Sequence, residues 1–172
     1  RRHTRYGTVT GVQTCALPIS APISGAGSLS VTSGTLILAG ANTYAGATTI
    51  GTGATLQVGN GSTVGTLGAA ASVANNGTLA ISRSANYTFA TNVTGTGGLT
   101  SAMTSGARLT LIGTNTYSGP TTVAAGTLFI SNANVWSNST DLVLGATGTA
   151  GTLDLNGTSK TFTSLATAGT AS

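Results

Sequence analysis

The chain has 172 residues, of which 40% are hydrophobic and only 5% charged, and its formal net charge is +4 at pH 7. This length is enough for one domain with a sizeable core. Disordered proteins combine high net charge with few β-branched residues, so this composition, rich in Thr, Val and Ile, excludes that class. No apolar run of about 18 residues occurs, and we therefore expect no transmembrane helix.

Residues 1–19 differ in composition from the remainder of the chain. They contain half of the basic residues together with the single histidine, His3, and the single cysteine, Cys15. Most of this segment resembles, in one reading frame, the translation of an indexed adapter used in short-read DNA libraries. We therefore interpret residues 1–19 as a sequencing artefact and expect the fold to lie in residues 20–172. The alternative is a genuine basic N-terminal arm.

Leaving out residues 1–19 changes the charge of the chain. The basic residues that remain are Arg83, Arg108 and Lys160, and the acids are Asp141 and Asp154, so the net charge is 3 − 2 = +1. A charge this small gives no argument for nucleic acid or an anionic membrane as a partner. With no cysteine left, a disulfide framework and a thiol metal site are both excluded, and we expect no cofactor and no metal.

Short segments in which apolar and polar residues alternate follow one another along the rest of the chain. Nearly every one holds two apolar residues spaced by two, which places both side chains on one face of a strand. Strands are expected around residues 29–31, 36–38, 48–50, 56–58, 79–81, 87–89, 99, 109–111, 123, 128–130, 142–144, 153–155 and 162. Turn signals such as Asn60-Gly61 and Asn76-Gly77 separate them. Glutamate is absent and good helix formers are scarce, so no helix is expected.

Two segments of the chain nearly repeat one another. Residues 40–50 read GANTYAGATTI, and residues 113–123 read GTNTYSGPTTV. Their flanks match as well, so the two copies extend over residues 23–59 and 93–132. The period of roughly 70–73 residues is typical of stacked units rather than of a globular domain with a single site.

Two all-β architectures fit this rhythm, a β-sandwich and a β-solenoid. The glycine-punctuated repeat and the mid-sized apolar residues favour the solenoid. We expect the equivalent Asn42 and Asn115 at the same corner of the coils, where asparagine can bond its own backbone and accept an unusual φ. A repeat of roughly 73 residues then corresponds to about three coils of roughly 24 residues, and residues 20–172 form about six coils.

The residues of the first copy form a recognisable pattern. Residues 36–59 read LILAGANTYAGATTIGTGATLQVG. This segment resembles the autotransporter-associated β-strand repeat of bacterial type V secreted proteins, as does the second copy between residues 109 and 130. The resemblance implies a right-handed parallel β-helix.

The resemblance also implies a location and a role. Residues 20–172 are expected to be a fragment of the passenger of a Gram-negative autotransporter, anchored at the cell surface through the outer membrane. Its partner would be its own outer-membrane β-barrel, encoded outside this sequence. The implied role is that of an extracellular stalk that assists passenger folding and surface display.

Catalytic chemistry has little support in the sequence. Hydrolysis of a glycoside needs two carboxylates that face the scissile bond, and Asp141 and Asp154 are the only acids available. No histidine remains in residues 20–172 to activate a serine or threonine. We therefore expect no catalytic, cofactor-binding or metal-binding residue, and no enzyme activity, in this segment. An alternative is that the chain is the scaffold of a β-helix enzyme whose active site lies elsewhere.

Trp136 is the one candidate for ligand contact. On an exposed loop its ring could stack on a sugar, which would make the chain a glycan- or host-binding adhesin surface; the alternative is a tryptophan in the core or at a cap. Arg83 and Arg108 stand alone in the sequence, and we expect both to be solvated. We expect a monomer that binds no nucleic acid.

Overall fold

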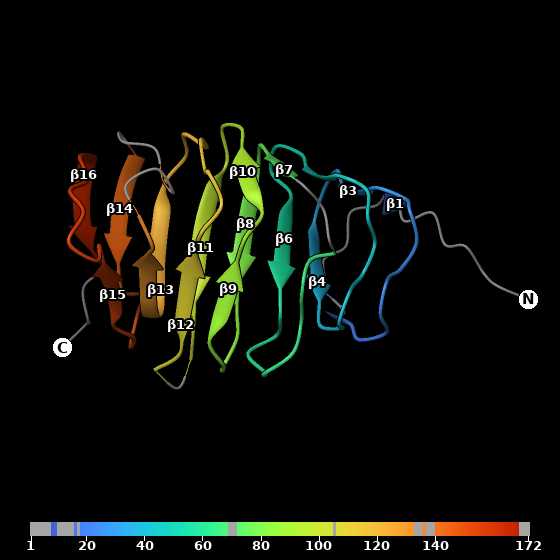
Figure 1. Cartoon of the computed structure of the whole chain (residues 1–172), viewed down its shortest axis with the longest axis horizontal. Helices are drawn as coiled ribbons and strands as arrows, with labels where there is room; N and C mark the ends of the chain where they lie inside the picture. Colours follow the sequence, from blue (N-terminus) through green and yellow to red (C-terminus); the bar gives the residue numbers. More distant parts are fainter. Residues whose placement is uncertain are drawn as a thin grey trace, which may run out of the picture.

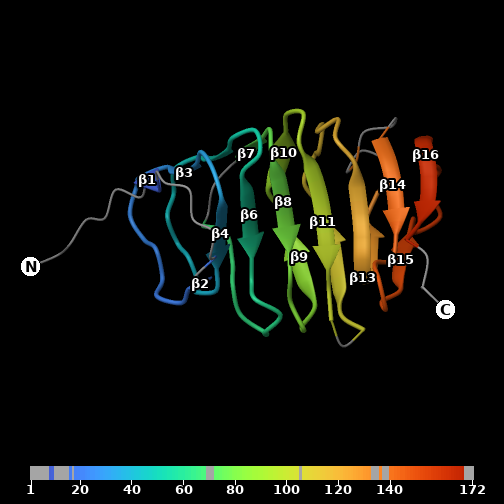
Figure 2. The same ribbon diagram turned by 180° about the vertical axis from the view of Figure 1, so that it is seen from behind.

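The strands of this chain stack into a parallel β-solenoid of about seven turns (Figure 1). The computed structural model describes residues 8–9, 16, 18–68, 72–104, 106–132, 136 and 140–168. Within these residues the structure is all-β and contains no helix, which confirms the predicted fold class. The same described residues include no apolar helix long enough to cross a membrane. Seen from both sides, the coils run along a single axis from β1 to β16 (Figures 1 and 2).

The coils form three ladders of parallel strands, which we call A, B and C; the described strands of ladder A lie in the N-terminal coils and those of ladder C in the C-terminal coils. Ladder A contains β1 (Thr8–Val9), β3 (Leu29–Val31), β5 (Thr48–Ile50), β7 (Ser72–Asn75) and β10 (Asn92–Thr94). Ladder B contains β2 (Pro18–Ile19), β4 (Thr35–Leu38), β6 (Thr55–Val58), β8 (Thr78–Ile81), β11 (Gly98–Ala102), the first half of β13 (Thr121–Ile130), β14 (Thr140–Leu144) and β16 (Phe162–Thr167). Ladder C contains β9 (Tyr87–Phe89), β12 (Arg108–Leu111), the second half of β13 and β15 (Gly151–Asp154).

The core is a set of apolar columns that run along the axis. Leu36, Leu56, Leu79 and Leu99 lie directly above one another in ladder B, and all four are buried. Successive coils therefore take 20, 23 and 20 residues. The sequence estimate of roughly 24 residues was too long, which is one reason why the predicted number of coils was low.

Pro18 and Ile19, at the end of the segment interpreted as an artefact, pair with the first coil. The carbonyl oxygen of Ile19 accepts hydrogen bonds from the amides of Ala39 and Gly40 at 2.9 and 3.1 Å. An open strand edge accepts any extended segment because its bonds are made by the backbone. The pairing can therefore be explained by the edge that β4 offers. It does not test the interpretation of residues 1–19 as a sequencing artefact, which stays a prediction.

Arg83 is buried, and the prediction of a solvated side chain is wrong for this residue. It is 8% exposed, and its guanidinium donates to the carbonyl oxygens of Thr63 and Gly65. The guanidinium carbon also lies 4.5 Å from the centre of the Tyr87 ring. The loop between β6 and β7 folds over Arg83, a contact that no local pattern in the sequence indicates. Arg108, in contrast, is exposed as predicted.

Candidate functional site

The two copies of the repeat bury their asparagine in the same way. Asn42 is 5% exposed; its Oδ1 accepts the amide of Ile23 at 2.8 Å, and its Nδ2 donates to the carbonyl oxygen of Gly40 at 3.2 Å. Asn115 is 1% exposed and makes the equivalent bonds, from the amide of Val93 at 3.0 Å and to the carbonyl oxygen of Gly113 at 3.0 Å. Each side chain therefore ties its own turn to the backbone of the preceding coil.

One part of the expectation for these asparagines was wrong. Both bond their own turn, as predicted, but neither has a positive φ. Among the described residues, Asn156 is the only non-glycine residue with a positive φ, at 49°. Asn42 and Asn115 are thus selected for the hydrogen bonds that the amide makes with buried backbone groups, which need partners once water is excluded.

A tyrosine and a threonine complete the buried polar cluster. The hydroxyl of Tyr44 lies 2.7 Å from Oγ1 of Thr48, and the hydroxyl of Tyr117 lies 2.7 Å from Oγ1 of Thr121. All four residues are buried. We call each set the Asn-Tyr-Thr clamp, made of Asn42, Tyr44 and Thr48 in the first copy and of Asn115, Tyr117 and Thr121 in the second.

The clamp tyrosines are held in their neutral form. Burial raises the pKa of Tyr44, and the hydrogen bond with Thr48 offsets part of this increase. Burial likewise raises the pKa of Tyr117, with a partial offset from its interactions with Thr121 and Trp136. Neither hydroxyl is available as a base or a nucleophile near neutral pH, because burial disfavours the phenolate. The chemistry of the clamp is therefore that of a set of fixed hydrogen bonds.

A glycine between the tyrosine and the threonine of each clamp allows two coils to touch. A Cβ on Gly46 would lie 2.4 Å from the carbonyl oxygen of Gly27, and a Cβ on Gly119 would lie 2.5 Å from that of Gly97. Neither Gly46 nor Gly119 has a positive φ. Gly46 and Gly119 are thus required by close backbone approach between coils, whereas Gly53 and Gly126 of the same repeats have positive φ values of 76° and 69°.

The two copies lie on different sides of the solenoid. In the first copy the three strands β4, β5 and β6 belong to ladders B, A and B. In the second copy the equivalent strands are β12, the first half of β13 and its second half, which belong to ladders C, B and C. The offset of 73 residues between Leu36 and Leu109 therefore corresponds to three coils plus one further side. The expectation that Asn42 and Asn115 share a corner was wrong for this reason.

Trp136 lies in the core beside the second clamp. It is 2% exposed, forms a parallel backbone bridge with Asn115, and has its ring centre 5.5 Å from that of Phe162. The ammonium group of Lys160 donates to the carbonyl oxygen of Trp136. These contacts match the alternative in which Trp136 is a core residue. Ligand contact by Trp136 stays a prediction, and it would require the ring to leave this position.

The two carboxylates are on different ladders and each has a local partner. Asp141 of β14 accepts a hydrogen bond from Oγ of Ser164 at 2.7 Å, and Asp154 of β15 accepts the amide of Asn156 at 2.9 Å. No group of three His, Cys, Asp or Glu residues that could hold a metal occurs in the described part of the chain. Among the residues that the structure describes, none forms an acid–base pair with either aspartate.

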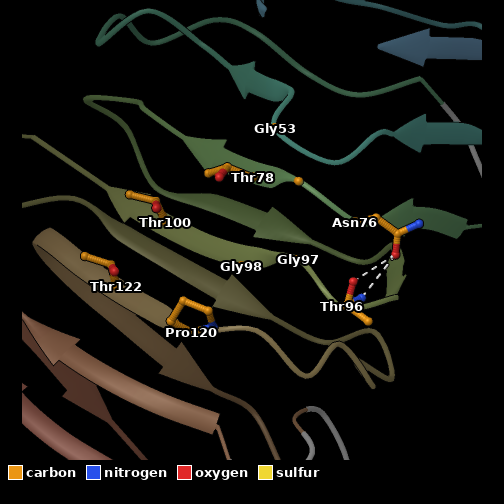
Figure 3. A pocket seen from close by; sticks show the side chains of 10 residues that line it. Gly53, Asn76, Thr78, Thr96, Gly97, Gly98, Thr100, Pro120 and Thr122 are labelled. Carbon is orange, nitrogen blue, oxygen red and sulfur yellow. Dashed lines mark hydrogen bonds between the residues drawn. The ribbon is translucent and has the colours of Figure 1, made fainter. Parts of the chain in front are cut away.

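A surface groove follows the corner between ladders A and B (Figure 3). Thr78, Thr100 and Thr122 stand along one side of it, and the backbone of Gly97 and Gly98 lies between them and Thr96. On the opposite side, the side-chain oxygen of Asn76 accepts bonds from the amide and hydroxyl of Thr96 at 3.2 and 3.3 Å. The lining has no ionisable group, so the groove offers hydrogen bonds but no acid or base.

Comparison with known families assigns the repeated segments. Residues 33–58 and 103–130 match the family described as the passenger-associated-transport-repeat. The chain carries two copies of this passenger repeat. Both clamps lie within the matched residues. The predicted resemblance to an autotransporter passenger is confirmed, and the passenger repeat together with the solenoid indicates a structural role. No curated protein and no solved structure matches the chain.

Proposed function

We propose that this chain is a non-catalytic stalk segment of an autotransporter passenger. It would work outside a Gram-negative cell, at the cell surface, after delivery through the outer membrane by the membrane-embedded domain of the same protein. Its task would be to fold coil by coil during export and so assist surface display. The passenger repeats support the location, and the way in which the clamps connect coils supports the task.

The observation that carries the proposal is that each clamp bonds one coil to its neighbours. Asn42 accepts the amide of Ile23 in the preceding coil and donates to the carbonyl oxygen of Thr66 in the following coil, at 2.7 Å. A coil that emerges from the membrane would complete these bonds only by docking on a coil already folded. In a solenoid each repeat is stabilised by its neighbours, so such docking would favour outward movement without ATP.

The arrangement of polar residues supports the non-catalytic part of the proposal. Asp141 and Asp154 are separated on two ladders, and the clamp tyrosines remain protonated at neutral pH. The buried hydroxyl groups of Thr48 and Thr121 are occupied by these tyrosines. The asparagines bond between coils, and the tyrosine–threonine bonds lie within one coil.

The test is a proline substitution in the full-length protein, followed by protease accessibility of the passenger on intact cells. Leu109 is fully buried in β12, which pairs with strands on both sides, so Leu109→Pro removes a ladder hydrogen bond and breaks the stack. We expect display to stall with the passenger retained in the periplasm.

Thr147→Pro is the matched control. Thr147 is exposed and occupies the second position of the turn closed by Ala146 and Thr149, followed by Gly148 with a φ of 76°. Proline is well accepted at that position of such a turn, so this variant should be displayed like the wild type. Normal display of Leu109→Pro would refute the proposal.

A further inference from the structure

Phe129 occupies an unusual position on the outer face of ladder C. Its strand neighbours Leu128 and Ile130 point into the core and are fully buried, so alternation directs Phe129 outward, where it is partly exposed. The other aromatic residues that the structure describes are buried or packed against the core: Tyr44, Tyr87, Phe89, Tyr117, Trp136 and Phe162. An aromatic ring on a surface made mainly of Thr, Ser, Ala and Asn is a candidate contact residue.

Arg108 is placed against this ring. Its side chain is exposed, and the guanidinium carbon lies 4.8 Å from the centre of the Phe129 ring. The structure shows no ion pair for Arg108 with a described acid. Arg83 and Lys160, in contrast, donate to backbone carbonyl oxygens. The guanidinium lies over the ring and is exposed to solvent. A guanidinium held in this way can bind a carboxylate through two hydrogen bonds.

The neighbouring strands add polar groups to the same outer row. Thr88, Thr110, Phe129 and Asp154 are register partners in β9, β12, β13 and β15. Adjacent strands are about 4.8 Å apart, so the row is a flat strip of two hydroxyl groups, one ring and one carboxylate over about 14 Å. We propose that this strip, with Arg108, is a contact site for a carboxylated glycan.

Each group on the strip matches one feature of such a ligand. The Phe129 ring would support the apolar face of a sugar, Arg108 would bind the carboxylate, and the hydroxyl groups of Thr88 and Thr110 would bond sugar hydroxyls. Asp154 would accept sugar hydroxyl groups and would repel a second negative charge close by. The strip therefore suits a sugar with a single carboxylate, held by Arg108, and with neutral hydroxyl groups facing Asp154.

An acidic peptide fits this face less well. β12 is paired with β9 on one side and with β13 on the other, so its backbone has no free edge on which a peptide could add as a strand. A run of acidic side chains would also place negative charge beside Asp154. The glycan is favoured because its contacts need only side chains on a flat face.

The first copy of the repeat provides the matched comparison. At the positions equivalent to Arg108 and Phe129 it has Thr35 and Gln57, on β4 and β6. The inward residues of these strands are apolar and buried in both copies. Thr and Gln are therefore compatible with the coil, and Arg108→Thr with Phe129→Gln should remove the strip without damaging the fold.

The experiment measures binding of sialyllactose, a trisaccharide with one carboxylate, to the whole chain by calorimetry, with its methyl ester as a probe of the same sugars without charge. We expect the wild type to prefer the acid form, and R108T/F129Q to bind it at least tenfold more weakly. The control variant T35A/Q57A in the first copy should bind like the wild type. Unchanged circular dichroism and thermal midpoint would show that R108T/F129Q is folded.

Three results would overturn the proposal. The first is equal binding of the acid and the methyl ester, and the second is unchanged binding by R108T/F129Q. The third is a polyglutamate peptide that binds more tightly than sialyllactose and loses binding in the same variant, which would assign the strip to an acidic peptide. The stalk function is tested separately by surface display, so neither result decides the other.

Discussion

The two copies of the passenger repeat agree in what they bury and differ in what they expose. Both bury an Asn, a Tyr and a Thr with the same hydrogen bonds, and both place glycine where coils touch. Their outer residues diverge, for example Gln57 in the first copy against Phe129 in the second. They also lie on different sides of the solenoid. The repeat therefore encodes how one coil is joined to the next, and it specifies neither the side nor the surface chemistry.

The largest expected effect is a loss of stability when the close approach of two coils is prevented, in either copy. Gly46→Ala and Gly119→Ala each force a Cβ into backbone of the preceding coil, and we expect each to cost about 3 kcal/mol of the free energy of unfolding. Gly27→Ala is the control, because a Cβ at Gly27 would meet nothing within 4 Å. Urea unfolding of the three variants is the measurement. Equal stability of Gly27→Ala and Gly119→Ala would exclude the role assigned to these glycines.

A smaller effect is expected from removing the clamp asparagines. Asn42→Ala and Asn115→Ala leave buried backbone groups of two coils without a hydrogen-bond partner. Each should lower the free energy of unfolding by about 2–3 kcal/mol, although the two residues face different sides of the solenoid. The control is Asn60→Ala, at an exposed position, which should change stability by less than about 0.5 kcal/mol. A large loss in one copy alone, measured by urea unfolding, would show that the two clamps are not equivalent.

The tyrosine–threonine bond should contribute less again. Tyr44→Phe leaves Oγ1 of Thr48 buried without its partner, and we expect a loss of about 1–2 kcal/mol. Adding Thr48→Val removes the second polar group, so the double variant should recover most of that loss. A double-mutant cycle in thermal unfolding measures the coupling, and the same cycle on Tyr117 and Thr121 compares the copies. Additive losses in either cycle would argue against a direct bond.

The smallest effect is a dependence on alkaline pH. Burial raises the pKa of Tyr44, Tyr87 and Tyr117 above the ordinary value of 10.0, so the folded state keeps protons that the unfolded chain releases. The stabilisation is complete below pH 10 and is lost as the pH rises toward the folded-state pKa. Each fully buried tyrosine should contribute a decrease of about 1.4 kcal/mol per pH unit. Unfolding midpoints measured between pH 8 and 11 should fall less steeply in Tyr117→Phe than in the wild type; parallel curves would contradict this assignment.

The sequence predicted most of the fold because strand alternation and the repeat are local patterns. Pairs such as Leu36 and Leu38 form inward columns as expected. Within residues 20–172 two strands were missed, β7 and β10, since Val73 and Val93 are each the single large apolar residue in their strand. The burial of Arg83 was missed as well, because it depends on a loop that returns over the side chain.

The candidate sites were less predictable than the fold. The importance of Asn42 and Asn115 was visible in the repeat, but their bonds join residues about 20 positions apart and depend on the length of the coil. Phe129 and Arg108 were not connected by any sequence motif, since their contact forms only when β12 pairs with β13. The sequence signal that could have indicated this site is the difference between the two copies at outward positions. These positions can be identified once the alternation of inward and outward residues is known.

The one-side offset between the copies places equivalent residues on different sides of the solenoid along its axis. If further repeats followed at the same spacing, each would appear one side further around the axis, and a repeat would return to its starting side after about ten coils, or roughly 48 Å along the rod. Outer residues placed at one repeat position would then wind around the rod in a spiral, instead of forming a single stripe. A rod built in this way would present the same contact residues in every direction, whatever its rotation at the cell surface.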